Sequence, residues 1–182
     1  ANPKAEIGVL SEWAGIQFLV DTLSTDYHAV APDYNKFPTA LCEMAEKYIK
    51  ENKPSLVAIC FDNPDHVGHK EGHDTPAYYS KLEELDGYIA RIVAAVKEAG
   101  MYDDTIFIIT SDHGGIKKGH GGKTMAEMQT PFIIAGKNIK KAGEFQESMV
   151  QYDVAATMAY IFGLEQPQVW TCLLYTSPSP RD

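Results

Sequence analysis

The chain has 182 residues, which is enough for one domain of ordinary size and too few for two comfortable ones. Hydrophobic residues make up 45% of the sequence and charged residues 23%, a balance typical of a globular protein with a core. The 25 acidic and 16 basic side chains give a formal net charge of −9. This charge argues against a nucleic-acid polymer or an anionic membrane as partner, because both attract Lys and Arg. No apolar run approaches the roughly 20 residues that span a bilayer, and three cysteines are too few for a disulfide framework.

Short apolar runs alternate with segments of helical periodicity along the chain. The expected strands lie at residues 6–10, 27–30, 55–61, 105–110 and 131–135, and the expected helices at residues 13–23, 38–50, 76–99 and 154–162. Thr75 and Pro76 are typical of a helix N-cap and first turn, and Gly100 is typical of a helix end. This alternation predicts an α/β fold, a three-layer α/β/α sandwich with a mostly parallel sheet.

The chain contains no internal repeat and no linker that would divide it, so one domain is expected over residues 1–172. Residues 173–182 are rich in Ser and Pro and have no amphipathic period, and a non-native or disordered tail is expected there. The sequence leaves the oligomeric state open.

The histidines are unevenly distributed, since five of the six lie between His66 and His120. Two segments there follow predicted strands directly, one beginning at Asp62 and the other at Ser111. Loops that follow parallel strands open at one edge of a sheet, where such folds bind ligands. The side chains expected to converge at that edge are Asp65, His69, Asp112, His113 and His120.

Carboxylate and imidazole groups together suit a borderline cation such as zinc. Asp65 and His69 are four residues apart, so a helical turn or a tight loop directs both at one ion. Asp112 and His113 are adjacent and are followed by two glycines, which allow the chain to turn. Two such pairs suggest two cations, an arrangement that clamps a phosphoryl group. Each residue alone also has a simpler interpretation, because an Asp after a strand is often a turn former and a loop His is usually solvated.

Lys123 follows His120 closely in the second segment. Its ammonium group is a candidate to contact an anionic substrate oxygen, and a solvated lysine is the alternative interpretation. His73 precedes the Thr75 cap and is expected to be a loop residue.

At these residues the sequence resembles the alkaline phosphatase superfamily, and in particular its nucleotide pyrophosphatase/phosphodiesterase branch and the sulfatase-like relatives. The resemblance is carried in order by Pro64-Asp65-x-x-Gly68-His69, Ser111-Asp112-His113-Gly114 and Gly119-His120-Gly121-Gly122. It implies two divalent metals, usually zinc, with Asp65, His69 and His120 holding one ion. Asp112 and His113 are implied as part of the other. A small phosphorylated substrate and a periplasmic or extracellular location are further implications of the resemblance.

Members of this superfamily also use an Asp and a Thr or Ser nucleophile from their first strand and helix, and nothing in residues 1–52 resembles that segment. We therefore expect the chain to be the C-terminal part of a hydrolase of phosphodiester, pyrophosphate or phosphomonoester bonds. Its sheet is expected to be incomplete at the N-terminus, and its second metal site is expected to be incomplete in this chain. The isolated chain is expected to be inactive. A sulfatase is the nearest alternative, although no Cys-x-Pro/Ala-x-Arg segment is present. The other two alternatives are a phosphomutase and a non-catalytic metal-binding module.

Overall fold

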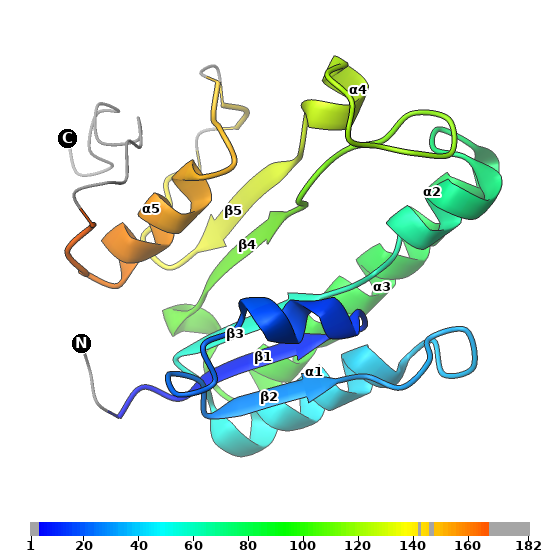
Figure 1. Cartoon of the computed structure of the whole chain (residues 1–182). Coiled ribbons are helices and arrows are strands. Elements are labelled where there is room, and N and C mark those ends of the chain that lie inside the picture. Colours follow the sequence, from blue (N-terminus) through cyan, green and yellow to red (C-terminus); the bar gives the residue numbers. More distant parts are fainter. Residues whose placement is uncertain (1–3, 142, 146–147, 168–182) are drawn as a thin grey trace. The chain divides into compact units, whose positions relative to one another are not determined.

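The computed structural model describes residues 4–141, 143–145 and 148–167, which form two compact units (Figure 1). One unit consists of residues 4–105 and 113–129, and the other consists of residues 106–112 and the described residues from 130 onward. Cys172 and the predicted tail at residues 173–182 lie outside the described residues.

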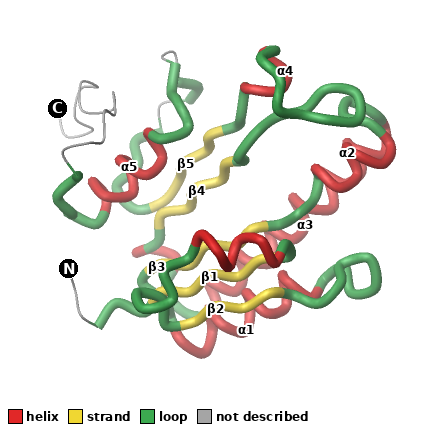
Figure 2. Tube along the Cα trace, in the orientation of Figure 1, coloured by secondary structure: helices red, strands yellow, loops and turns green. Residues whose placement is uncertain are grey.

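The larger unit contains a three-stranded parallel sheet in the order β2-β1-β3. Gly8 of β1 is paired with Tyr27 of β2 on one side and with Val57 of β3 on the other. Figure 2 shows the helices and strands along the trace. The elements of this unit are β1 (Ile7–Ser11), η1 (Ala14–Leu19), β2 (Tyr27–Val30), α1 (Ala40–Asn52), β3 (Leu56–Cys60), α2 (Asp65–Glu71), α3 (Pro76–Glu98), η2 (Tyr102–Asp104) and α4 (Met125–Met128). The expected α/β fold with a parallel sheet and flanking helices is confirmed.

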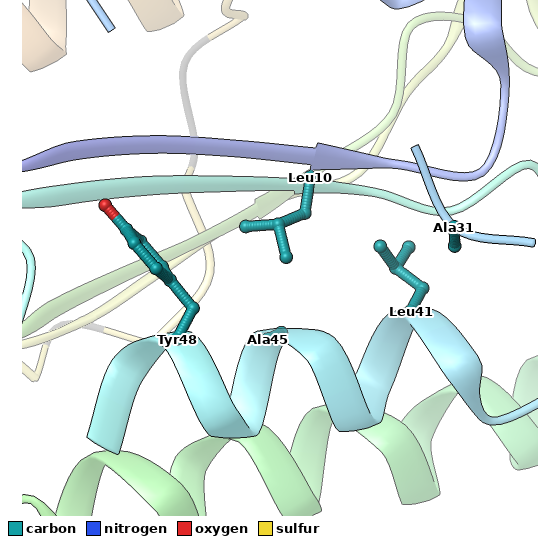
Figure 3. Packing of buried hydrophobic residues seen from close by; sticks show 5 residues of the cluster. All are labelled: Leu10, Ala31, Leu41, Ala45 and Tyr48. Atoms are coloured by element: carbon teal, nitrogen blue, oxygen red, sulfur yellow. The ribbon is translucent and has the colours of Figure 1, made fainter. Parts of the chain in front are cut away.

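The core of this unit lies between the sheet and α1. Leu10 of β1 is fully buried and packs in one cluster with Leu41, Ala45 and Tyr48 of α1 (Figure 3). Gly8 allows the Tyr48 ring to approach the sheet, because a Cβ atom at Gly8 would lie 2.2 Å from Tyr48 Cε1. The apolar spacing along α1 therefore places one helix face on the sheet, as its sequence predicts.

Helix α3 packs beside α1, and its ends follow the sequence signals. The Thr75 hydroxyl accepts a hydrogen bond from the Tyr78 backbone N–H, and Pro76 is the first helical residue. Gly100 follows the helix with a φ of 72°, a conformation that favours glycine. Arg91 donates two hydrogen bonds to the Glu46 carboxylate, at 2.8 and 2.9 Å, which lowers the pKa of that carboxyl and ties α3 to α1.

The smaller unit pairs β4 (Ile106–Thr110) with β5 (Phe132–Gly136) in an antiparallel ladder and also contains α5 (Asp153–Ile161). The N-cap residue of α5 is Tyr152, and Asp153 is the first helical residue. The buried Asp153 carboxylate accepts a hydrogen bond from the Val150 backbone N–H at 2.8 Å. It therefore closes the preceding turn.

The helix predicted at residues 13–23 is wrong in extent and in burial. The structure has only the short 3₁₀ helix η1 there, and none of its residues is buried. Phe18 and Leu23 are 83% and 96% exposed. A 3₁₀ helix has three residues per turn, so an apolar spacing of three and four does not gather on one of its faces.

Two short helices, α2 and α4, are absent from the expected order of elements. Each has seven residues or fewer, too short for a helical period to stand out from its surroundings. Within the part of the chain that the structure describes, no helix is both long and apolar enough to cross a bilayer.

Candidate metal centre

Helix α2 brings Asp65 and His69 together. Because they are four residues apart, both side chains lie on one face of the helix. His69 Nε2 is 3.2 Å from Asp65 Oδ2.

The segment from His113 to His120 supplies the third side chain of this group. Its Ile116 and Gly119 are bridged to each other, and the Lys118 ammonium donates a hydrogen bond to the Lys70 carbonyl of α2 at 2.7 Å. His120 Nε2 consequently lies 3.7 Å from Asp65 Oδ1. Among the described residues, the one group of three donors that lie within 4.8 Å of one another is Asp65, His69 and His120.

The hydrogen bonds of His69 define which ring nitrogen carries its proton. Nδ1 of His69 lies 2.9 Å from the Lys118 carbonyl oxygen, which can only accept a hydrogen bond. In the neutral ring the proton is therefore on Nδ1, and Nε2, which lies 3.2 Å from Asp65 Oδ2, is the nitrogen that can bind a cation. Metal-binding histidines commonly show this arrangement, in which a backbone carbonyl holds the other ring nitrogen.

Asp65 Oδ1 is buried and has no hydrogen-bond partner. It lies 3.5 Å from His73 Nε2 and 3.7 Å from His120 Nε2, while Oδ2 lies 3.2 Å from His69 Nε2. Ligands about 2.0–2.1 Å from a tetrahedral zinc ion lie about 3.3 Å from one another. His69 Nε2 has this spacing to Asp65 Oδ2, at 3.2 Å, whereas the 3.7 Å spacing of His120 Nε2 is to the other oxygen, Oδ1. One donor atom of each residue lies within 4.8 Å of the others, so the donor set fits a divalent cation shared by one carboxylate and two imidazoles.

His73 was expected to be a loop residue, and in the structure its ring also packs beside the donor group. It lies in the turn after α2 with its ring buried, and its Nε2 is 3.5 Å from Asp65 Oδ1. Its backbone N–H donates to the Lys117 carbonyl at 2.6 Å. The ring fills the space between Gly68 and Gly115, where added Cβ atoms would lie 2.4 and 2.2 Å from it. The sequence signal for this packing role is the presence of glycine at the two positions that meet the ring, Gly68 and Gly115.

The two glycines after His113 were expected to allow the chain to turn, but the structure gives a different reason for glycine at these positions. Neither adopts a positive φ. A Cβ atom at Gly114 would lie 2.2 Å from the Ala126 carbonyl oxygen, and one at Gly115 would meet the His73 ring. Close approach of neighbouring groups, and not a left-handed turn, explains why glycine is required at these two positions.

The other predicted site residues are not members of this donor group. The His113 ring stacks on the His120 ring with centroids 3.6 Å apart, and its Nδ1 contacts the Gly114 carbonyl at 2.8 Å. Asp112 is exposed and belongs to the smaller unit, in which it follows β4. Lys123 is exposed in the segment before α4. The assignment of Asp112 and His113 to a second cation, and of Lys123 to substrate, stays a prediction.

Glu127 is a residue whose local role was not anticipated. Its carboxylate accepts hydrogen bonds from the Gly122 backbone N–H at 2.8 Å and from the Thr124 hydroxyl at 2.6 Å. These bonds lower the pKa of Glu127. The Glu127 carboxylate also accepts from the Thr124 backbone N–H at 3.4 Å, and the Thr124 side chain accepts from the Glu127 backbone N–H, which is a capping box at the start of α4. The Thr124-x-x-Glu127 spacing is the sequence signal from which this cap could have been found.

The Gly115→Ala variant is expected to lose about 1–3 kcal/mol of unfolding free energy, because its methyl group overpacks the His73 ring. Gly119→Ala in the same segment is the matched control, since nothing lies within 4 Å of its added Cβ atom. Urea denaturation of both variants measures the difference. Equal stability of the two would contradict the packing of His73 between the glycines.

Comparison with known proteins gives one family and several relatives. Residues 9–149 match the family described as type I phosphodiesterase / nucleotide pyrophosphatase. The catalytic subunit of human GPI ethanolamine phosphate transferase 2 is 28% identical over 142 residues, which cover 75% of this chain and 14% of that protein. The 2,3-bisphosphoglycerate-independent phosphoglycerate mutase of Vibrio vulnificus is 31% identical over 171 residues, 90% of this chain and 31% of that protein. The chain thus spans less than a third of the length of these two relatives.

Among solved structures, a 2-O GAG sulfatase superposes with a TM-score of 0.73 over 91% of this chain and 52% of that chain. The two sequences are 15% identical over the superposed part. At this identity the similarity concerns the fold, and it leaves the substrate open.

Proposed function

Because the chain belongs to the type I phosphodiesterase / nucleotide pyrophosphatase family of the alkaline phosphatase superfamily, we propose that it carries one metal centre of a two-metal hydrolase of phosphodiester, pyrophosphate or phosphomonoester bonds. The enzymes of this superfamily depend on divalent metals and act on phosphoesters and related esters. The observation that carries the proposal is the group Asp65, His69 and His120, whose donor atoms lie within 4.8 Å of one another.

Asp65, His69 and His120 would hold a divalent cation, which we propose to be zinc. Such a cation supplies positive charge to the non-bridging oxygens of a phosphoryl group. The chain's own contribution is to fix the donors: the Lys118 carbonyl holds His69 Nδ1 at 2.9 Å and so orients Nε2 toward the carboxylate.

The remaining parts of the proposal rest on the resemblance and on residue chemistry. Asp112 and His113 would contribute to a second cation, and Lys123 would contact an anionic substrate oxygen. The nucleophile would be a Thr or Ser of the first strand and helix of the superfamily fold, a segment to which nothing in residues 1–52 is similar. We accordingly propose that this chain by itself does not turn over substrate. From the family resemblance we also propose that the whole protein acts in the periplasm or outside the cell.

Three nitrophenyl substrates test this proposal when they are assayed side by side: a phosphodiester, a phosphomonoester and a sulfate ester. The zinc-loaded chain is compared with a longer chain that adds the nucleophile segment of a relative at its N-terminus. We expect hydrolysis of a phosphate ester by the longer chain only, and loss of that activity in its Asp65→Asn variant. His66→Ala on the same helix is the control, since His66 is not in the donor group.

Each other outcome has a distinct meaning. Equal turnover by the chain alone would contradict the need for a further nucleophile segment. Cleavage of the sulfate ester alone would identify a sulfatase. Zinc binding without turnover of any of the three esters by the longer chain would favour a non-catalytic metal-binding module.

A further inference from the structure

A cavity of about 320 Å³ opens at the edge of the parallel sheet where its strands end. Its walls come from the segments that follow the three strands and from α3. Glu12 directly follows β1, Tyr34 follows β2, and Asn63 follows β3. Open α/β folds bind ligands at this edge, and the volume is that of a small-molecule pocket.

The cavity is separate from the candidate metal centre. Both use the start of α2, but successive helical residues are rotated by about 100°. His66 and Val67 line the cavity, whereas Asp65 and His69 face the metal centre on another side of the helix. A ligand in the cavity therefore contacts different side chains from those of the proposed hydrolytic site.

The strong hydrogen-bond donors of the wall are already in use. The Tyr34 hydroxyl donates to the Asp62 carboxylate, and the Tyr88 hydroxyl donates to Glu84. Lys81 donates to the same Glu84 carboxylate at 2.5 Å. These three donors are thus directed at carboxylates of the protein itself.

Glu12 and Asn63 also lie at the wall. Asn63 Oδ1 is buried and has no hydrogen-bond partner. The Glu12 carboxylate accepts a hydrogen bond from the Asp62 backbone N–H at 2.8 Å and is also held by the Asn63 backbone N–H, and burial raises the pKa of its carboxyl. Buried acceptors are stabilised by a ligand that supplies donors or positive charge.

The aromatic side chains of the wall favour the same kind of ligand. Tyr34 and His66 meet edge to face with their ring centroids 5.3 Å apart, and Tyr88 lines the same cavity. Ring faces attract cations, and they attract organic ammonium groups in particular. The carboxylates here do not form a metal site, because Glu12 and Glu84 belong to no group of three close donors among the described residues.

We propose that this cavity is a second ligand site that binds a small organic ammonium group. Glu12 supplies the charge, and the rings of Tyr34, His66 and Tyr88 supply the apolar contact.

Choline is a suitable probe, and its uncharged isostere dimethylbutanol is the matched control ligand. Amide chemical shifts of the metal-free chain are recorded by NMR while either compound is added to about 50 mM. Choline is expected to cause saturable shifts at Asn63, His66 and Tyr88, with a dissociation constant of about 1–10 mM. Dimethylbutanol is expected to bind at least about fivefold more weakly.

Glu12→Gln tests the charge without removing the acceptor for the Asp62 N–H, and choline affinity is expected to fall about fivefold. Glu51→Gln, an exposed position on α1, is the control and is expected to bind as wild type. Equal binding of the isostere, unchanged binding by Glu12→Gln, or no saturable shift at the cavity would each overturn the proposal. The titration uses no metal and no turnover, so its result is independent of the proposed hydrolase activity.

Discussion

The Asp65→Asn variant is expected to bind Zn²⁺ more than about 100-fold more weakly than the wild-type chain. Asp65 is the residue that both histidines of the donor group face, at 3.2 and 3.7 Å. Loss of an outer partner of a metal ligand costs about 10–100-fold in affinity, so loss of a charged ligand costs more. Calorimetry, or competition with a chromophoric chelator, measures the two dissociation constants.

Thermal unfolding gives a second measure of the same effect. Zn²⁺ at about 100 times its dissociation constant stabilises a folded protein by about 2.7 kcal/mol. The wild-type chain is expected to gain this stability on zinc addition and to lose it on chelation, whereas Asp65→Asn is expected to respond to neither. His66→Ala is the control and should behave as wild type. An Asp65→Asn chain that binds zinc as tightly as wild type would remove the basis of the metal centre.

Replacing Leu10 with alanine is expected to lower the free energy of unfolding by about 2–5 kcal/mol. Leu10 is fully buried between the sheet and α1, where it packs against Leu41, Ala45 and Tyr48. Truncation leaves a cavity there, because neighbouring elements hold the α1 side chains and relax only in part.

Leu23→Ala is the matched control for this substitution, since Leu23 is 96% exposed. Its unfolding free energy is expected to change by less than about 0.5 kcal/mol. Urea denaturation of both variants at one pH gives the comparison. Similar midpoints for Leu10→Ala and Leu23→Ala would mean that the cluster around Leu10 is not the core of the larger unit.

The contrast between α3 and residues 13–23 indicates how far sequence periodicity can be used. Both segments have apolar residues spaced by three and four, but only α3 also has a capping Thr75, a Pro76 at its first turn and a Gly100 at its end. In residues 13–23 the periodicity had no such boundary signals, and the apolar side chains there are largely exposed. Local capping chemistry therefore decided which apolar pattern became a long helix.

The sequence by itself determined the α/β class, the positions of the strands and long helices, and the pairing of Asp65 with His69. These features depend on contacts between residues near in sequence, such as capping, periodicity and a spacing of four on a helix. Only the tertiary structure decided that His120 reaches Asp65, that His73 is buried between two glycines, and that Tyr34 at the Glu12 cavity donates to Asp62. The contacts join residues far apart in sequence: 55 positions for His120 and Asp65, 42 for Gly115 and His73, and 28 for Tyr34 and Asp62. They depend on how the segment from His113 to His120 packs on α2 and on how the segments that follow β2 and β3 meet at the sheet edge.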